Sequence, residues 1–539
     1  MTGWTDTYVR ETRPRFVRHD DFRDGSRTLR VQRGRRLSCL SRPSEVSHPC
    51  AVTSSLPFNT RARPHKIRKR NQFSLRAHEH VSTTPSVSVE RQGVEQKMKV
   101  MIAGGGLGGL FLAISLIKKG FEVTVLERTE NYRAFGGPIQ LASNGTGTLK
   151  ATSERLYTAV QRHSRPFWGT LSGIKDGFTG EWMFRFDAIT RIPNERNLPF
   201  ALCIDRSDLQ TCLLGEIQLL NSDERYGHAN ILMGAALKSY RQDALTRKVS
   251  VELENGSSLE GDILVGADGI WSTVRAQMLC EPQHRRGSRS SASHTGFRLF
   301  SALPIHQCAD FFDIGYCAYI GPENYFVTCP DRSGRMQWYA FIKSKPEAEQ
   351  IENPKDFLLK TFQGWSSDVT ALISVSEEQD ISQRDLWDRP PCLKGWSDGN
   401  VVLLGDSCHA TMPNIGQGCG LAFEDAFVLS HILDDLKDPY EAASALKVYC
   451  SQRLLRTAAI QGLGRMNSEA IKILTPLLPI KPVIDFVISP FLPLVFELQF
   501  GYCYSFCPST ESSNDSVRYA DQMRKRHEAE CISAWKGSA

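Results

Sequence analysis

The sequence predicts an α/β fold built on a Rossmann-type parallel sheet, with an interleaved α+β domain and a mainly helical C-terminal region. Three observations support this prediction. Residues 98–127 contain in order a strand, a glycine turn, a helix, a second strand and an acid. Residues 262–269 and 401–406 are apolar strands that each end beside an adjoining aspartate and glycine. With 539 residues, the chain is long enough for two or more domains.

The first of these segments is the most informative. Its opening run, 98–103, is apolar throughout, as expected of a buried parallel strand. The turn 104–109 reads GGGLGG and fits the pattern GxGxxG, and 110–117 follows as an apolar helix. A second strand at 121–126 ends in Glu127. This order is typical of a dinucleotide-binding βαβ unit.

Each residue type in that unit has a physical role. Gly104 permits the tight turn, Gly106 lets the backbone approach a pyrophosphate, and Gly109 lets the helix pack closely on the strand. The helix N-terminus offers free N–H groups and partial positive charge to the phosphates. Glu127 can accept both hydroxyls of an adenosine ribose and repels a 2′-phosphate. The unit therefore predicts an FAD or NAD site rather than an NADP site.

The two later segments favour FAD. Residues 262–275 give a strand followed by Asp268-Gly269, with Ser272 and Arg275 downstream. Residues 401–425 give a strand followed by Gly405-Asp406, then Pro413, Gly416 and Gly418 before a helix. A plain NAD dehydrogenase requires neither segment.

With these motifs the chain resembles the single-component FAD-dependent monooxygenases of the aromatic-hydroxylase type. The resemblance implies that the first glycine turn and Glu127 hold the ADP half of FAD and that Asp406 contacts the ribityl chain. It links Asp268-Gly269 to the pyrophosphate and to passing NADPH, and matches Arg206 and Gln210 to an FAD-contacting helix start. The cofactor-binding residues expected in this way are Gly104, Gly106, Gly109, Glu127, Arg128, Gly137, Arg206, Gln210, Asp268, Gly269, Gly405, Asp406, Pro413, Gly416, Gly418 and Cys419.

Within that family the sequence of residues 98–440 most resembles the zeaxanthin epoxidases. The likeness includes Met336–Phe341, Arg384–Arg389 and the block from Leu403 to Asp425. One departure lies two residues after Gly418, where the family usually has Asn and the epoxidases Cys. This chain has Gly420 there.

The resemblance implies epoxidation of zeaxanthin to antheraxanthin and violaxanthin. The partners would be O2, a carotenoid-like apolar molecule and an electron source, either NADPH or a ferredoxin-type protein. A flavin hydroperoxide would carry the chemistry, so we expect no catalytic side chain. Trp338 and Tyr339 lie on a predicted strand and are candidates for the substrate cavity, with core packing as the alternative. An aromatic-ring hydroxylase, a flavin-dependent prenyl reductase and a non-enzymatic escort protein are the rival functions.

Within the Leu403–Asp425 block, three residues invite a catalytic interpretation. We interpret His409 as a brace for the loop after Asp406. Glu424 and Asp425 are expected to complement the dipole of a helix start.

Charge and cysteine content argue against nucleic-acid-binding, disulfide-rich secreted and metal-binding proteins. The first 96 residues hold 17 Arg and 2 Lys against 9 acidic residues, so the rest of the chain is net negative although the whole carries +6. We therefore expect no nucleic-acid partner for the folded body. The 15 cysteines form neither CxxC pairs nor a secreted disulfide framework, and we expect no metal site.

The domain boundaries follow from composition. Residues 1–96 are rich in Arg and Ser and predict a disordered or transit arm that directs the protein to a plastid, although five acids in its first 24 residues are unusual for one. Residues 97–440 form the FAD-binding domain, with its substrate part at about 165–200 and 280–385. Residues 441–539 form the C-terminal region. Its apolar segment 473–506 is broken by prolines, which disfavours a spanning helix. Two interpretations remain: a buried cap, or a peripheral contact with the thylakoid membrane surface.

Overall fold

A computed structural model of the chain describes residues 98–132, 137–282, 292–303, 314–346, 348–436, 439–474, 491–506 and 508. Contacts separate the chain into Met1–Val89 and Glu90–Ala539, and all described residues belong to the second unit. The predicted arm at 1–96 lies outside the described residues.

The first sheet has six strands in the order β18-β19-β12-β1-β2-β8. β1 pairs in parallel with β12 on one side, Val100 opposite Ile263, and with β2 on the other, Val100 opposite Val123. Only β18 runs antiparallel to its neighbour. The strands are β1 Lys99–Ala103, β2 Glu122–Leu126, β8 His228–Leu232, β12 Ile263–Gly266, β18 Ser397–Asp398 and β19 Val401–Leu403. Their continuous apolar runs are buried, as the sequence predicts for parallel strands.

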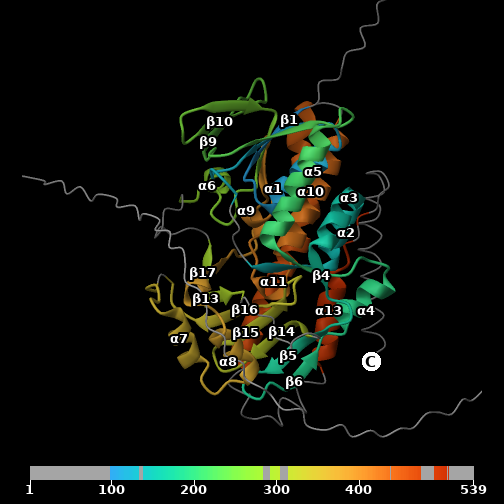
Figure 1. Cartoon of the computed structure of the whole chain (residues 1–539). Coiled ribbons are helices and arrows are strands. Elements are labelled where there is room, and N and C mark those ends of the chain that lie inside the picture. Colours follow the sequence, from blue (N-terminus) through green and yellow to red (C-terminus); the bar gives the residue numbers. More distant parts are fainter. Residues whose placement is uncertain are drawn as a thin grey trace, which may run out of the picture. The chain divides into compact units, whose positions relative to one another are not determined.

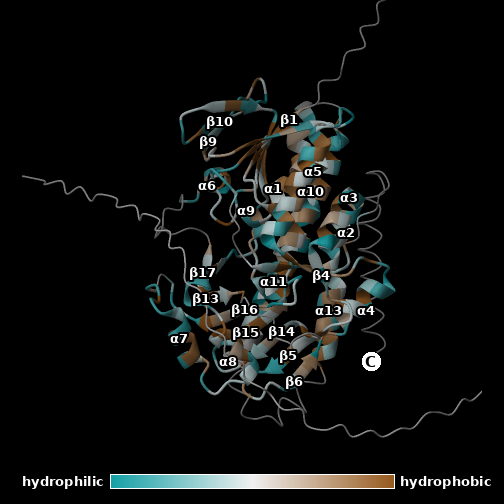
Figure 2. Ribbon diagram, viewed as in Figure 1, coloured by the Kyte–Doolittle hydropathy of each residue, from teal (hydrophilic) through white to brown (hydrophobic). Residues whose placement is uncertain are grey.

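Three helices pack together beside this sheet (Figure 1). They are α1 Leu107–Ile117, α5 Arg206–Asn221 and α10 Gly418–Asp434. α1 contacts both of the others and is buried along most of its length. A three-stranded sheet of β9 Leu237–Gln242, β10 Val249–Leu253 and β11 Ser258–Gly261 shares the same hydrophobic core. In Figure 2 the strands beside β1 are mainly brown, in keeping with that core.

A second large sheet has seven strands in the order β17-β13-β16-β15-β14-β5-β6. All its pairs are antiparallel except that of β14 with β5. Its strands are β5 Leu171–Asp176, β6 Trp182–Arg185, β13 Ser293–Ala302, β14 Ile314–Ile320, β15 Tyr325–Pro330, β16 Met336–Lys343 and β17 Ser382–Asp388. Helices α7 Pro354–Thr361 and α8 Ser367–Ser374 contribute Leu358 and Leu372 to a core that contains Phe326 and Trp338 of the sheet. The sheet is thus assembled from two stretches of chain separated by elements of the first sheet.

Smaller elements connect the two sheets. A three-stranded sheet has the order β3-β7-β4, and α2 contacts α10. These elements are β3 Pro138–Leu141, α2 Ser143–Thr152, α3 Glu154–Arg162, β4 Ser164–Pro166, α4 Ala188–Glu195, β7 Leu202–Asp205, α6 Thr273–Met278 and α9 Asp406–His409.

The C-terminal region is helical where it is described. α11 Ala442–Leu474 packs against α10, and α13 Leu492–Cys503 packs against α4. Residues 475–490, which hold most of the prolines of the predicted apolar segment, lie outside the described residues. Among the described helices, none combines the length and the apolar character required to cross a membrane.

Candidate functional site

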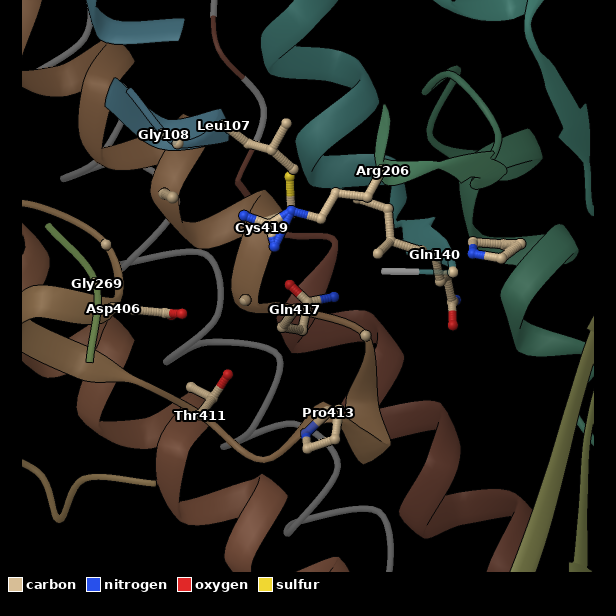
Figure 3. A pocket seen from close by; sticks show the side chains of 18 of the residues that line it. Leu107, Gly108, Gln140, Arg206, Gly269, Asp406, Thr411, Pro413, Gln417 and Cys419 are labelled. Atoms are coloured by element: carbon tan, nitrogen blue, oxygen red, sulfur yellow. The ribbon is translucent and has the colours of Figure 1, made fainter. Parts of the chain in front are cut away.

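A cavity of about 390 Å³ lies between the elements of the two large sheets. Its lining combines the glycine turn after β1, the loop before α10 and the face of the seven-stranded sheet (Figure 3). It brings together eleven residues that the sequence singled out: Gly106, Gly137, Arg206, Gly269, Tyr339, Gly405, Asp406, Pro413, Gly416, Gly418 and Cys419. Gly104, Gly109, Glu127, Arg128, Gln210, Asp268 and Trp338 do not line it.

The three glycines of the GxGxxG pattern occupy different environments. Gly104 has φ +108°, and a Cβ there would lie 2.4 Å from the carbonyl oxygen of Ala267. A Cβ on Gly109 would lie 2.0 Å from the carbonyl oxygen of Gly104, so the helix could not approach the strand. A Cβ on Gly106 would meet nothing within 4 Å and would point into open space. Gly106 therefore keeps room free in the cavity, whereas Gly104 and Gly109 shape the turn.

Glu127 and Gln210 stabilise the turn from behind. One carboxylate oxygen of Glu127 accepts the N–H of Gly105 at 2.9 Å, and the other accepts the N–H of Thr129 at 2.9 Å. The amide of Gln210 donates to the carbonyl oxygen of Gly105 at 3.4 Å. Arg128 is exposed. In this structure Glu127 and Gln210 position the backbone of the turn.

The Asp268-Gly269 turn begins a helix and borders the cavity. Asp268 accepts the N–H groups of Thr273 and Val274, at 2.7 and 3.2 Å, and so caps α6. Gly269 has φ +80° and lines the cavity. Arg275 is 4% exposed and donates to the carbonyl oxygens of residues 407 and 408, which ties this turn to the Gly405-Asp406 turn. In this structure Arg275 therefore has a structural role.

Asp406 and Arg206 face the same space from opposite sides (Figure 3). Within the described part of the chain, neither side chain has a hydrogen-bond or ion-pair partner. Asp406 is exposed to solvent through the cavity, although protein atoms lie around its carboxylate. Burial raises the pKa of Asp406, although His409 and Arg206 oppose the rise. An unpaired carboxylate in this position can accept hydrogen bonds from ligand hydroxyls.

The loop before α10 presents backbone to the cavity. Pro413 starts a short 3₁₀ turn, Gly416 follows with φ +60°, and α10 begins at Gly418. The Cys419 thiol lines the cavity, and burial raises its pKa to about 12, so it stays protonated at neutral pH. The free N–H groups of this helix start can stabilise negative charge on a ligand.

The glycine at position 420 has a packing reason. A Cβ there would lie 3.0 Å from the Asn144 amide nitrogen, and a Cβ on Gly145 would lie 3.1 Å from the Cα of Gly420. α2 and α10 therefore approach each other closely at two facing glycines. The Asn144 amide nitrogen donates to Gln417 at 2.9 Å and to Glu424 at 2.6 Å.

Glu424 and Asp425 belong to a buried ion-pair network, which corrects the prediction that they complement a helix dipole. Neither lies in the first turn of α10. Arg453 contacts both, at 2.7 Å each, and Arg456 contacts Glu424 at 2.6 Å. Asp425 also accepts the N–H of Gly405 at 3.0 Å. Sequence reasoning missed both arginines. Their only signal is a three-residue spacing, which places both on one face of α11.

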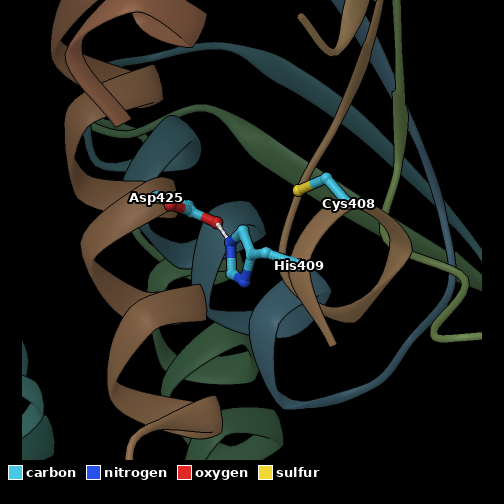
Figure 4. A group of neighbouring side chains, drawn as sticks. All are labelled: Cys408, His409 and Asp425. Carbon is cyan, nitrogen blue, oxygen red and sulfur yellow. Dashed lines mark hydrogen bonds and ion pairs between the residues drawn. The ribbon is translucent and has the colours of Figure 1, made fainter. Parts of the chain in front are cut away.

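His409 joins the same network (Figure 4). Its Nε2 lies 2.5 Å from the Asp425 carboxylate, and the residue is 1% exposed. Burial raises the pKa of Asp425, but His409 and Arg453 outweigh it and hold the value at about 2. His409 therefore braces the Gly405-Asp406 turn against α10, as interpreted from the sequence.

Cys408, His409 and Asp425 have potential metal-ligating atoms within 4.8 Å of one another. His409 and Asp425 bond each other, and the Arg453 guanidinium occupies the other Asp425 oxygen. These contacts satisfy the carboxylate and place a fixed positive charge beside it. The cluster is better suited to an internal ion pair than to a cation.

The structure separates the two candidate substrate residues. Tyr339 lines the cavity, and its hydroxyl donates to the carbonyl oxygen of Pro138. Trp338, the next residue on β16, faces the opposite side of the sheet, is fully buried and donates to the Ser376 hydroxyl at 2.9 Å. Alternation along the strand explains the difference. This corrects the expectation for Trp338, which is a core residue.

The site fits the group that the sequence predicts. Gly106 leaves space beside the N-terminus of α1, Arg206 offers a free cation and Asp406 a free carboxylate. A dinucleotide with phosphates and a hydroxylated chain needs these three features. Sequence reasoning missed several cavity residues of the seven-stranded sheet: Leu299, Tyr316, Val327, Cys329, Phe341 and Arg384.

Comparison with known sequences finds similarity to FAD-binding proteins. The family described as FAD binding domain matches residues 214–461. The chain is 36% identical over 397 residues to "Zeaxanthin epoxidase, chloroplastic" from an Oncidium hybrid cultivar, covering 71% of this chain and 56% of that protein. It is 36% identical over 439 residues to the protein of the same description from Prunus armeniaca, covering 79% and 62%. The chain thus spans little more than half the length of these relatives.

Solved structures share the fold. HpxO from Klebsiella pneumoniae, complexed with FAD and uric acid, superposes with a TM-score of 0.59 at 20% identity, over 79% of this chain and 96% of that chain. A salicylate hydroxylase substrate complex superposes with a TM-score of 0.61 at 18% identity, over 79% and 98%. At these identities the likeness establishes the fold alone.

Proposed function

We propose that this chain is an FAD-dependent monooxygenase acting on an apolar substrate, in keeping with its match to the FAD binding domain at residues 214–461 and its similarity to the zeaxanthin epoxidases. The reaction is epoxidation of zeaxanthin to antheraxanthin and violaxanthin. One observation carries the proposal: the cavity joins the dinucleotide-type turn, Asp406 and Arg206 to an apolar wall of the seven-stranded sheet.

The electron and atom balance needs a donor. A ring alkene gains one oxygen atom of O2, and the second leaves as water with two protons and two electrons. We propose NADPH, or a reduced ferredoxin-type protein, as the source of those electrons. Reduced FAD supplies the activation of O2.

The residues of the chain bind and shield. Gly106 and the α1 N-terminus hold the pyrophosphate, Arg206 adds positive charge, and Asp406 accepts hydrogen bonds from the ribityl hydroxyls. Leu299 and Phe341 keep water from the reacting carbons, which protects the oxidant from loss as hydrogen peroxide.

The ionisable lining favours epoxidation over phenol hydroxylation. Among the described residues that line the cavity there is no His, Glu or Lys. Burial raises the pKa values of Tyr316 and Tyr339, so neither can take a proton at neutral pH. Asp406 is assigned to the ribityl chain. Epoxidation of an alkene requires no base to ionise the substrate, whereas hydroxylation of a phenol benefits from one.

We also propose that the protein works in a plastid at the thylakoid surface. The plastid proposal rests on the Arg-rich arm and on the chloroplastic description of the relatives. An apolar stripe along one side of α13 supports membrane contact, since four apolar side chains spaced for one helix face are exposed: Phe491, Leu494, Val495 and Leu498.

Product analysis tests the reaction. The purified protein with FAD, NADPH or reduced ferredoxin, and O2 is supplied with zeaxanthin in lipid vesicles or with a phenol. We expect O2 consumption coupled to mono- and di-epoxide formation. Hydroxylation of the phenol with unchanged zeaxanthin would replace the proposal by an aromatic hydroxylase. Reduction of a substrate double bond without O2 uptake would indicate a reductase.

A further inference from the structure

The sheet wall of the cavity is an ordered apolar surface with one cation at its margin. In the strand register, Leu299 of β13 lies between Phe341 of β16 and Arg384 of β17. Tyr339, two residues before Phe341 on β16, pairs with Val327 of β15. All five line the cavity. Arg384 is on the edge strand, so its guanidinium borders the apolar wall.

The Arg384 side chain, like that of Arg206, differs from the other arginines of this region. Within the described residues it has neither a hydrogen bond nor an ion pair. By contrast, Arg298 pairs with Asp385 at 2.9 Å, and Arg389 with Glu281 at 3.4 Å. Asp385 and Glu281 are thus already paired with these other arginines.

The surroundings of Arg384 also disfavour an isolated charge. Burial lowers its pKa, and the Arg206 cation lowers it further, against an opposing effect of Tyr339. An arginine remains charged under these conditions. Arg384 is exposed to solvent at the cavity, so a ligand that displaces this water must offer the guanidinium an oxygen acceptor in its place.

We infer that Arg384 is a specificity residue that donates hydrogen bonds to a hydroxyl oxygen of a mostly apolar substrate. The inference rests on the proposed function, for which the acceptor is the hydroxyl of the β-ring next to the alkene that is epoxidised. The apolar wall accommodates the ring and polyene, and Arg384 recognises the single polar group. A polyene without hydroxyls would leave the guanidinium unpaired.

The competing source of an acceptor oxygen is FAD itself. Asp406 belongs to the glycine-turn side of the cavity lining, whereas Arg384 stands in the register row of Leu299 and Phe341. This placement favours the substrate as the partner, and the experiment separates the two sources.

The test compares wild type with Arg384→Met and Arg384→Lys as FAD-loaded proteins. Arg185→Met, an exposed position on β6 of the same sheet, controls for loss of a positive charge. Zeaxanthin and β-carotene are titrated in detergent micelles, and Kd is read from the perturbation of the flavin spectrum. Epoxide formation is measured in a separate assay. Binding and turnover are thus scored independently.

We expect wild type and Arg185→Met to bind zeaxanthin about 10- to 100-fold more tightly than β-carotene. Arg384→Met should lose that preference through weaker zeaxanthin binding, with β-carotene binding and FAD content unchanged, and Arg384→Lys should retain part of it. An unchanged preference in Arg384→Met overturns the inference. Loss of FAD from Arg384→Met with an unchanged preference assigns the contact to the flavin and also overturns it.

The two proposals fail differently. Tight, Arg384-dependent zeaxanthin binding without epoxide contradicts the proposed reaction and supports the recognition of the hydroxyl. Epoxide formation with equal affinity for both polyenes contradicts the inference alone. If neither polyene binds wild type, both are wrong.

Discussion

Gly106 shows how a single missing side chain can keep a ligand path open. Its backbone, with φ −73° and ψ 179°, suits any residue, and a Cβ would meet nothing within 4 Å. We expect Gly106→Leu to fold with a melting temperature near that of wild type and to lose most of its FAD, because the side chain fills the pyrophosphate path. Flavin absorbance per protein and thermal unfolding measure the two effects.

Two further glycines serve as controls for that result. Gly462→Leu places the same side chain in open space at an exposed position of α11 and should retain FAD. Gly109→Leu should lower stability itself, since its Cβ would overlap the Gly104 carbonyl. Full flavin retention in Gly106→Leu would contradict the assigned path.

At Asp406 we expect FAD binding and the stability of the folded protein to favour different side chains. Its pKa is raised by burial, so between pH of about 4 and the raised value the folded protein binds more protons than the unfolded chain. Stability therefore falls as pH rises through this window, and the loss persists above it. Flavin-free Asp406→Asn should melt higher than wild type at pH 8, and the difference should vanish at low pH.

The same substitution should weaken FAD binding about tenfold or more, because an amide accepts hydrogen bonds less strongly than a carboxylate. Asp398→Asn, at an exposed position of β18, is the matched control and should change neither property. Equal FAD affinity in Asp406→Asn and wild type would argue against the ribityl assignment.

At the scale of elements, α11 stabilises the Gly405-Asp406 turn through α10. Arg453 is 1% exposed and bonds Asp425, which in turn holds Gly405 and His409. Arg453→Met leaves two buried carboxylates short of a partner. We expect a loss of about 3–5 kcal/mol in the free energy of unfolding, measured by urea denaturation.

The control for this change lies on the same helix. Lys447→Met removes a positive charge at an exposed position and should alter the free energy of unfolding by less than about 0.5 kcal/mol. If both variants unfold alike, the buried network contributes nothing beyond net charge, and the bracing role of α11 is wrong.

At the scale of the whole molecule, the arm and the body separate. Contacts divide the chain near residue 89, and the described body begins at Met98. A chain that starts at Gln96 should keep its FAD content, melting temperature and activity. The first 96 residues fused to a fluorescent reporter should carry it into plastids. A cytosolic reporter, or a shortened chain without FAD, would contradict the respective half of this prediction.

Local patterns in the sequence were sufficient for four of the six strands of the first sheet, β1, β2, β12 and β19, and for the turns beside them. Strand, glycine turn, helix and strand follow one another within 98–127, so their geometry depends on neighbouring residues. The tight turns at Gly104 and Gly405 are likewise predictable, because these backbone conformations with positive φ favour glycine. The Gly405-Asp406 turn and the start of α10 were predictable for the same reason.

Only the tertiary structure decided what faces the cavity from the second sheet and what holds the loop from below. Tyr339 and Trp338 are adjacent and both aromatic, and the strand's orientation alone turns one toward the cavity and the other into the core. Arg384 reaches the cavity through pairing with a strand more than 80 residues earlier in the chain. Arg453 finds Asp425 across two helices. Such contacts depend on long-range packing, because periodicity fixes which residues share a face but not which partner that face meets.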